Sequence, residues 1–194
     1  MRASLALVLI ALAGPGCTSP LGARSAPPAA ELSPEAVVLT VPVEAQEGDA
    51  DCGLACLTAL LRFHGADLDD AARHRFPPTG VDGVRAGDIR DYLDGRGFRA
   101  HLVRGTLDEA PPAGLLRVLR RGLPVLVALT PPGGDRSHYV LVSGFDPERR
   151  LLVLMDPAWG AGAVPFDRFD ALWAGAERLM LVAAPTAQAA RPGG

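Results

Sequence analysis

The sequence lacks several features that would place it in a common functional class. It has a formal net charge of -3 and no long run of basic residues. Because phosphate binding needs clustered Lys and Arg, nucleic acid is excluded as a partner. No GxxxxGK motif followed by Ser or Thr occurs, which excludes a nucleotide-binding loop of that type. Its three cysteines form no CxxC pair, so neither a zinc site nor another cofactor is expected.

The N-terminus carries the pattern of an export signal. Met1 and Arg2 precede an apolar run over residues 3–13. This run is too short to span a bilayer and is typical of a secretory signal peptide. We therefore expect residues 1–17 to act as a signal peptide and the protein to be exported.

Cys17 is a candidate for lipid attachment. It follows the small residue Gly16 and resembles the lipidated cysteine of bacterial lipoproteins, although Gly14 stands where such motifs usually carry Leu. Cleavage by an ordinary signal peptidase after Ala13 is the alternative. Lipid on Cys17 would anchor the protein to a membrane. By resemblance to the sorting rule of enteric bacteria, Thr18 then predicts a periplasmic protein on the outer membrane.

The remaining chain divides into three parts. Residues 18–35 are rich in Pro, Ala and Ser without periodicity, which predicts an extended tether that holds the domain off a membrane. Residues 36–183 suffice for one well-buried domain and not for two. Residues 184–194 are expected to form a disordered tail.

The order of the expected elements indicates the fold class. Helices are mostly early and strands late, which predicts an α+β domain with a mostly antiparallel sheet packed on the first helix. The runs 124–130 and 138–145 are apolar on both faces and are therefore expected to be central strands. Helices are expected over 52–64, 68–76, 86–95, 111–121 and 166–173, and strands over 98–103, 124–130, 138–145, 151–155 and 178–183.

Cys52 is expected at the start of a buried helix. The apolar residues that follow have helical spacing with little polar face, Asp51 stands at the N-cap position, and Gly65 provides the C-terminal stop. A thiol in the first turn faces unpaired backbone N–H groups and the positive end of the helix dipole, which favour the thiolate. The alternative is a small apolar core residue.

A predicted hairpin brings His138 and Asp156 together. A turn centred near Pro147 places the two residues directly opposite each other, close enough for the carboxylate to bond the imidazole. This pairing requires an odd number of loop residues, because a slip of one residue puts the side chains on opposite faces. A base and its orienting group need this arrangement. Alternatively, His138 is a hydrogen-bonded histidine at a strand end and Asp156 a turn residue.

Together these motifs resemble a known family. Gln46 and Cys52 in QEGDADCGLACL, His138 in HYVLVSGFD and Asp156 in MDP are similar to the bacteriocin-processing, or double-glycine leader, cysteine peptidases. Members stand at the N-terminus of certain ABC exporters or occur as free-standing proteins. The resemblance implies a papain-like cysteine peptidase fold that covers at least residues 41–157.

The resemblance also implies a role for each of the four residues. Cys52 would be the nucleophile, His138 its general base and then acid, and Asp156 the group that orients the imidazole. Gln46 would donate its side-chain amide to the oxyanion together with the Cys52 N–H. The chemistry of acyl transfer independently requires these residue types. It needs a thiolate, a base that titrates near neutral pH, a carboxylate that fixes the tautomer of this base, and a neutral donor where negative charge develops.

The substrate is less defined than the chemistry. The chain shows no exporter membrane domain and carries an export signal, whereas exporter leader peptidases face the cytosol, so Gly-Gly specificity does not transfer directly. The leading interpretation is a cysteine peptidase that acts on a peptide or protein of the bacterial envelope. The alternatives are a thiol acyltransferase on the same fold and a non-cleaving peptide-binding module of a secretion or export system.

Other candidate residues have simpler interpretations. Cys56 is expected in the core, because cysteines four apart on a regular helix have poor geometry for a disulfide. His64 suits a helix C-terminus. His101 is the alternative base worth testing. Trp159 and Trp173 are expected to be core or rim aromatics near the Asp156 loop, with a substrate contact as the second interpretation.

Overall fold

The computed structural model of the chain describes residues 19–21, 31–48, 50–76 and 83–186. The helices are α1 (Cys52–Phe63), α2 (Asp70–Arg75), α3 (Ala86–Gly95), α4 (Leu115–Arg120) and α5 (Phe166–Gly175). The strands are β1 (Val37–Val38), β2 (Phe98–Arg104), β3 (Val125–Leu129), β4 (His138–Asp146), β5 (Leu151–Asp156), β6 (Gly160–Pro165) and β7 (Leu179–Pro185).

A seven-stranded sheet forms the centre of the fold, in the order β2-β7-β3-β4-β5-β6 with β1 paired to β4. All pairs between these strands are antiparallel. The two runs that are apolar on both faces, β3 and β4, lie at the middle of the sheet as predicted. The predicted α+β fold, with an antiparallel sheet packed on the cysteine helix, is confirmed.

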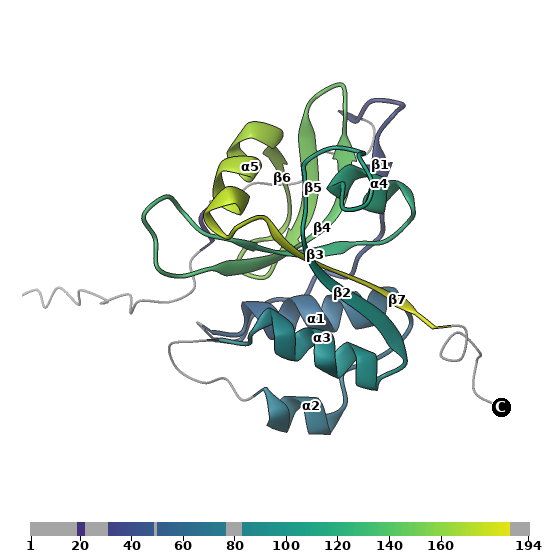
Figure 1. The fold of residues 1–194 in the computed structure, drawn as a ribbon, viewed down its shortest axis with the longest axis vertical. Helices are drawn as coiled ribbons and strands as arrows, with labels where there is room; N and C mark the ends of the chain where they lie inside the picture. Colours follow the sequence, from purple (N-terminus) through teal and green to yellow (C-terminus); the bar gives the residue numbers. More distant parts are fainter. Residues whose placement is uncertain (1–18, 22–30, 49, 77–82, 187–194) are drawn as a thin grey trace, which may run out of the picture.

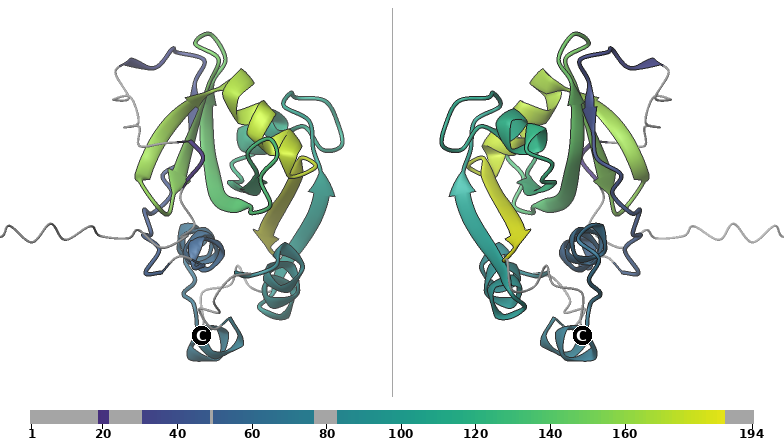
Figure 2. Two further views of the ribbon diagram at one scale, coloured as in Figure 1. Left: turned by 90° about the vertical axis from the view of Figure 1, so that its left-hand side faces the viewer. Right: turned by 90° about the vertical axis from the view of Figure 1, so that its right-hand side faces the viewer.

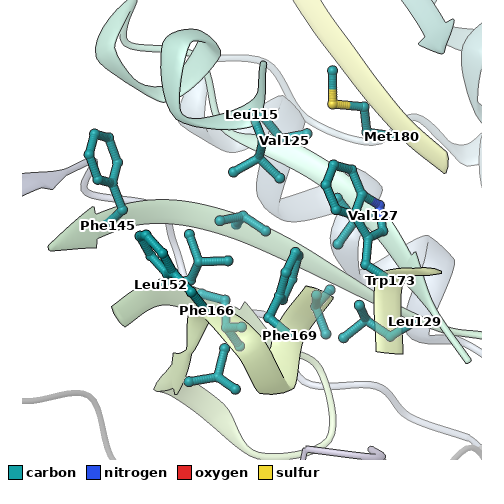
Figure 3. Packing of buried hydrophobic residues seen from close by; sticks show 14 of the residues in the cluster. Leu115, Val125, Val127, Leu129, Phe145, Leu152, Phe166, Phe169, Trp173 and Met180 are labelled. Carbon is teal, nitrogen blue, oxygen red and sulfur yellow. The ribbon is translucent and has the colours of Figure 1, made fainter. Parts of the chain in front are cut away.

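Helices cover both faces of this sheet. In Figures 1 and 2, α1, α2 and α3 lie on one side and α4 and α5 on the other. Alternate residues of a strand serve the two layers: Leu126 and Leu141 pack with α1 and α3, whereas Val125 and Val140 pack with α4 and α5. Figure 3 shows part of the second layer, where Trp173 of α5 lies among strand residues. Both faces of the central strands therefore bury apolar surface.

α1 begins at Cys52 as predicted, but Asp51 does not cap it with its side chain. The Asp51 backbone has φ -92° and ψ 1° rather than the extended geometry from which a side chain reaches the first-turn amides. The helix ends at His64, and Gly65 follows with a φ of 75°, the left-handed conformation that suits glycine. Eight α1 residues are buried, in agreement with the predicted lack of a polar face.

The structure differs from the predicted elements at several points. α4 begins at Leu115 rather than 111, because a bridge between Thr106 and Gly114 closes the preceding residues into a loop. β7 continues to Pro185, so the folded domain extends past residue 183. β6 was not predicted, since its sequence GAGAVP has few β-branched or aromatic residues, and the strand lies at the sheet edge.

Parts of the predicted tether contact the domain. Leu21 is buried in the core beside α4 and α5, and Ser33 bonds Asp146 through both its N–H and its hydroxyl. The prediction that residues 18–35 hold the domain at a distance therefore does not describe these positions. Cys17 and the proposed signal peptide lie outside the described residues. In the described part of the chain, no helix combines the length and apolar character needed to cross a membrane.

Candidate active site

His138 starts β4 and Asp156 ends β5, at the open end of one hairpin. The hairpin loop, residues 147–150, holds an even number of residues, whereas the predicted direct pairing needs an odd number. The predicted register is therefore wrong. With this loop, an uninterrupted register would put the two side chains on opposite faces of the sheet.

A β-bulge at Ser143 returns the two side chains to one face. The register between β4 and β5 shifts by one residue just before Gly144, which leaves Ser143 as the extra residue. Its Oγ donates to the Val153 carbonyl at 3.3 Å, and its own carbonyl accepts from the Leu39 N–H at 2.8 Å. A Cβ on Gly144 would come within 2.3 Å of a β1 carbonyl, so glycine permits this close approach.

His138 and Asp156 form a buried hydrogen-bonded pair. The His138 Nε2 and Asp156 Oδ1 atoms are 2.8 Å apart, and the residues are only 2% and 3% exposed. Continuing the register beyond the bulge places Asp156 opposite Val140, so His138 is its diagonal neighbour on the same face. The predicted contact is thus present, through a different register.

The surroundings of Asp156 favour the carboxylate form. Burial alone raises the pKa of Asp156, but the hydrogen bond and charge of His138, the Ser19 hydroxyl and the Ala158 N–H together lower this pKa below its ordinary value. The Ala158 N–H donates to Oδ1 at 2.9 Å. Since an ionised carboxylate only accepts hydrogen bonds, the shared proton belongs to Nε2 of His138. The second ring nitrogen, Nδ1, is also buried.

Cys52 lies at the same corner of the molecule. It is 3% exposed at the first position of α1, the helix that packs across β4. A Cβ on Gly53 would lie 3.2 Å from the ring of Tyr139, so these two residues are in close contact. The first turn of α1, which begins with Cys52, therefore packs against the start of β4, the strand that begins with His138. Burial, followed by the nearby Cys52, raises the pKa of Tyr139 to about 12.

Cys56 lies one turn further along α1 and is fully buried. Burial raises the pKa of the Cys56 thiol, and the charge of Asp156 raises it further. The same carboxylate therefore suppresses ionisation of this second thiol. Cys56 is a core residue, as predicted.

Gln46 joins the segment before α1 to the loop after Asp156. Its backbone N–H donates to the Pro157 carbonyl at 3.0 Å. The Gln46 side chain lines a cavity of about 200 Å³ together with Asp51 and Ala55 of the α1 region, and its Oε1 atom is buried. All four predicted site residues thus lie where α1 meets the open end of the hairpin.

The other candidates lie apart from this corner or in the core. His101 is exposed on the edge strand β2, which β7 and β3 separate from β4, so it is not placed to act as the alternative base. His64 caps the C-terminus of α1. Trp173 is buried and donates its Nε1–H to the Leu179 carbonyl at 2.9 Å, whereas Trp159, in the loop after Asp156, is 54% exposed. Among the described residues, no group of His, Cys, Asp and Glu side chains is arranged to hold a metal.

Comparison with known proteins gives the family. Residues 40–188 match the pattern of the Peptidase C39 family. The chain belongs to this family. Membership supports a cysteine peptidase hydrolase, in agreement with the resemblance seen in the motifs. No curated protein matches the chain in sequence.

Solved structures of C39 and related peptidases share the fold. The peptidase domain of Streptococcus ComA, a bi-functional ABC transporter involved in a quorum sensing pathway, is 22% identical with a TM-score of 0.58, over 74% of this chain and 98% of that chain. A double glycine motif protease from an AMS/PCAT transporter, in complex with the leader peptide, is 20% identical with a TM-score of 0.59, over 77% and 95%. A C39-like peptidase from Bacillus anthracis is 18% identical with a TM-score of 0.60, over 77% and 98%.

Two features of the site were not predicted from the sequence, namely the bulge at Ser143 and the packing of Ser19 near Asp156. The bulge at Ser143 had a signal, since a glycine inside a strand often marks a bulge or a close backbone approach, and Gly144 follows directly. The contact of Ser19 with Asp156 had none, because residues 18–35 show no periodicity from which packing could be predicted.

Proposed function

We propose that this C39 family member is a cysteine peptidase that cleaves a peptide or protein of the bacterial envelope. The buried hydrogen bond between His138 and Asp156 carries the proposal, and the packing of the α1 first turn against Tyr139 at the start of β4 supports it. The envelope location rests on the N-terminal export pattern. A peptide substrate is supported by the solved relative that holds a leader peptide.

Attack begins with transfer of the Cys52 proton to His138. Asp156 accepts from Nε2, so Nδ1 is the nitrogen that takes the proton, and the carboxylate stabilises the resulting imidazolium. The thiolate then adds to the scissile carbonyl carbon and forms a tetrahedral intermediate. The Gln46 side-chain amide and the Cys52 N–H donate to its oxyanion.

Collapse of the intermediate breaks the peptide bond. His138 returns the proton to the leaving amine, which departs and leaves an acyl thioester on Cys52. His138 then removes a proton from water as the oxygen adds to the thioester. Collapse of this second intermediate releases the product acid, and His138 returns the proton to the Cys52 sulfur. An amine acceptor in place of water would give acyl transfer through the same thioester.

The different environments of the Cys52 and Cys56 thiols allow a test of the proposed nucleophile. Iodoacetamide should alkylate Cys52 well below about pH 8, the range in which an unactivated thiol becomes reactive. Cys56 should react far more slowly, because burial and the Asp156 charge raise its pKa. Mass spectrometry of the intact and digested protein measures both rates, and a thiol-directed peptidyl probe should label Cys52 alone.

Cys56→Ala is the matched control and should leave the labelling of Cys52 unchanged. Envelope proteins that are cleaved by the wild type and not by Cys52→Ala then identify the substrate. Equal alkylation rates for the two thiols would contradict an activated nucleophile. Tight peptide binding without turnover, unchanged in Cys52→Ala, would show a peptide-binding module instead.

A further inference from the structure

Three residues near the N-terminus pack against the domain from outside the family match. Ser19 and Leu21 precede residues 40–188, yet they are only 9% and 4% exposed. Leu21 joins the apolar core that contains Leu154 of β5 and Val164 of β6. These residues of the Pro- and Ala-rich segment thus belong to the folded structure.

The side chain of Arg168 in α5 binds the backbone of this segment. Its Nη2 donates to the Pro20 carbonyl at 3.1 Å and to the Leu21 carbonyl at 3.3 Å. The Leu21 N–H in turn donates to Ser19 Oγ at 3.2 Å, which closes a turn. Backbone bonds and a buried side chain therefore fix the position of the Ser19 hydroxyl.

The segment lies close to Asp156, the carboxylate of the proposed triad of Cys52, His138 and Asp156. Leu21 and Asp156 line the same small cavity, together with Trp159. Asp156 Oδ1 already accepts from His138 and Ala158, whereas Oδ2 is buried and makes no hydrogen bond of standard geometry to any residue that the structure describes. The Ser19 hydroxyl is close enough to help lower the pKa of Asp156.

Serine chemistry fits this position. A hydroxyl can accept and donate at the same time, so accepting from the Leu21 N–H leaves its proton for a second partner. Asp156 is the neighbouring buried acceptor, and a buried carboxylate is stabilised by each further donor.

We propose that Ser19 is a positioning residue for the C39 site, which donates its hydroxyl to Asp156, and that Leu21 and Arg168 form the latch that keeps it there. The inference rests on the proposed function for its catalytic consequence, but not for the contact itself. In this arrangement a segment outside the family domain helps Asp156 to stay ionised and to hold the His138 ring.

Two kinds of measurement on the full chain test the latch. Carbon-13 NMR titration of the Asp156 carboxyl reports the contact whether or not the protein turns over. Ser19→Ala should move the Asp156 titration to higher pH, and Ser19→Thr, which keeps the hydroxyl, should restore it. On a cleaved substrate, Ser19→Ala should lower kcat roughly tenfold, the usual cost of one hydrogen bond to a charged group. It should also shift the acid limb of the pH profile upward.

Ser33→Ala is the matched control. Ser33 donates its hydroxyl to Asp146, a buried aspartate at the other end of the same hairpin, at 2.8 Å. Its loss should leave the titration of Asp156 and the acid limb of activity unchanged. Arg168→Ala, which changes an exposed side chain, should reproduce the effect of Ser19→Ala by releasing the latch.

The outcomes separate the two proposals. An Asp156 titration that is identical in wild type, Ser19→Ala and Arg168→Ala overturns the latch, even if the protein cleaves peptides. An upward shift in both variants, in a protein that cleaves nothing, keeps the latch and overturns the peptidase. An equal shift in Ser33→Ala would show a general effect of hairpin stability and would also overturn the latch.

Discussion

The two ends of the β4–β5 hairpin each bury one aspartate, but they use it differently. At the turn end, Asp146 accepts from the Ser33 N–H and hydroxyl, at 2.8 Å each, and from the Arg149 N–H at 3.0 Å. At the open end, Asp156 accepts from an imidazole nitrogen at 2.8 Å. The Asp146 carboxylate thus fixes the hairpin turn, whereas the Asp156 carboxylate binds the imidazole ring of His138, which can carry a proton.

Burial does not distinguish these two groups. The residues are 0% and 3% exposed, and in both cases burial raises the pKa while hydrogen bonds lower it below the ordinary value. Backbone N–H groups and a serine fix the state of Asp146, whereas His138 is the first of the groups that lower the pKa of Asp156. The identity of the hydrogen-bond partner, rather than the perturbed pKa, therefore marks which aspartate is a candidate for catalysis.

Exchanging each aspartate for asparagine should produce the largest contrast between the two ends. Asp156→Asn removes the charge that stabilises the imidazolium and can present the wrong tautomer to Nε2, so kcat should fall by about 10⁴. Asp146→Asn should leave kcat within a few-fold of wild type and lower the free energy of unfolding instead. Turnover assays and urea unfolding of both variants measure the contrast. Similar kcat values for the two would contradict the assignment of Asp156 to the triad.

The sequence was sufficient for the elements that depend on local pattern. Apolar spacing located α1, and apolar runs without a polar face located the two central strands. The four candidate site residues were chosen from their types and order, which carry the family resemblance. Residue type and order along the chain are therefore enough to nominate the residues of the candidate site.

The geometry that joins them depends on contacts distant in sequence. The bulge at Ser143 forms where β1 pairs with β4, and the Leu39 N–H donates to the Ser143 carbonyl at 2.8 Å. Gly144 within β4 signals a bulge, but the register that results depends on this contact with a distant segment. The packing of Ser19 and Leu21 likewise depends on a cavity built by β5 and β6. Tertiary contacts of this kind leave little trace in a linear pattern.

A second variant tests whether the open end includes the oxyanion donor. Gln46→Ala removes one donor, so kcat should fall by about 10² to 10³ while the peptide Kd changes little, because the oxyanion exists only during reaction. Glu47→Ala, at the exposed neighbouring position, is the control and should keep kcat. Single-turnover kinetics and peptide titrations separate the two effects. A rise in Kd that accounts for the whole loss would assign Gln46 to substrate binding.

The smallest expected effect sharpens the comparison at the turn end. Ser33→Ala removes one hydroxyl donor from Asp146 and leaves the Ser33 N–H in place. Near neutral pH it should lower the free energy of unfolding by about 1–2 kcal/mol, with kcat unchanged.

This loss of stability should itself depend on pH. The pKa of Asp146 is lowered in the folded protein, so its contribution is present above the ordinary aspartate pKa of about 3.9 and is lost as the pH falls through the folded value. The difference between wild type and Ser33→Ala should therefore shrink in acid. Ser143→Ala breaks a bond between a hydroxyl and the neutral Val153 carbonyl of the same hairpin, so its cost should stay constant with pH. Urea unfolding at neutral and acid pH compares the two, and parallel pH curves would show that the Ser33 bond gains nothing from the charge of Asp146.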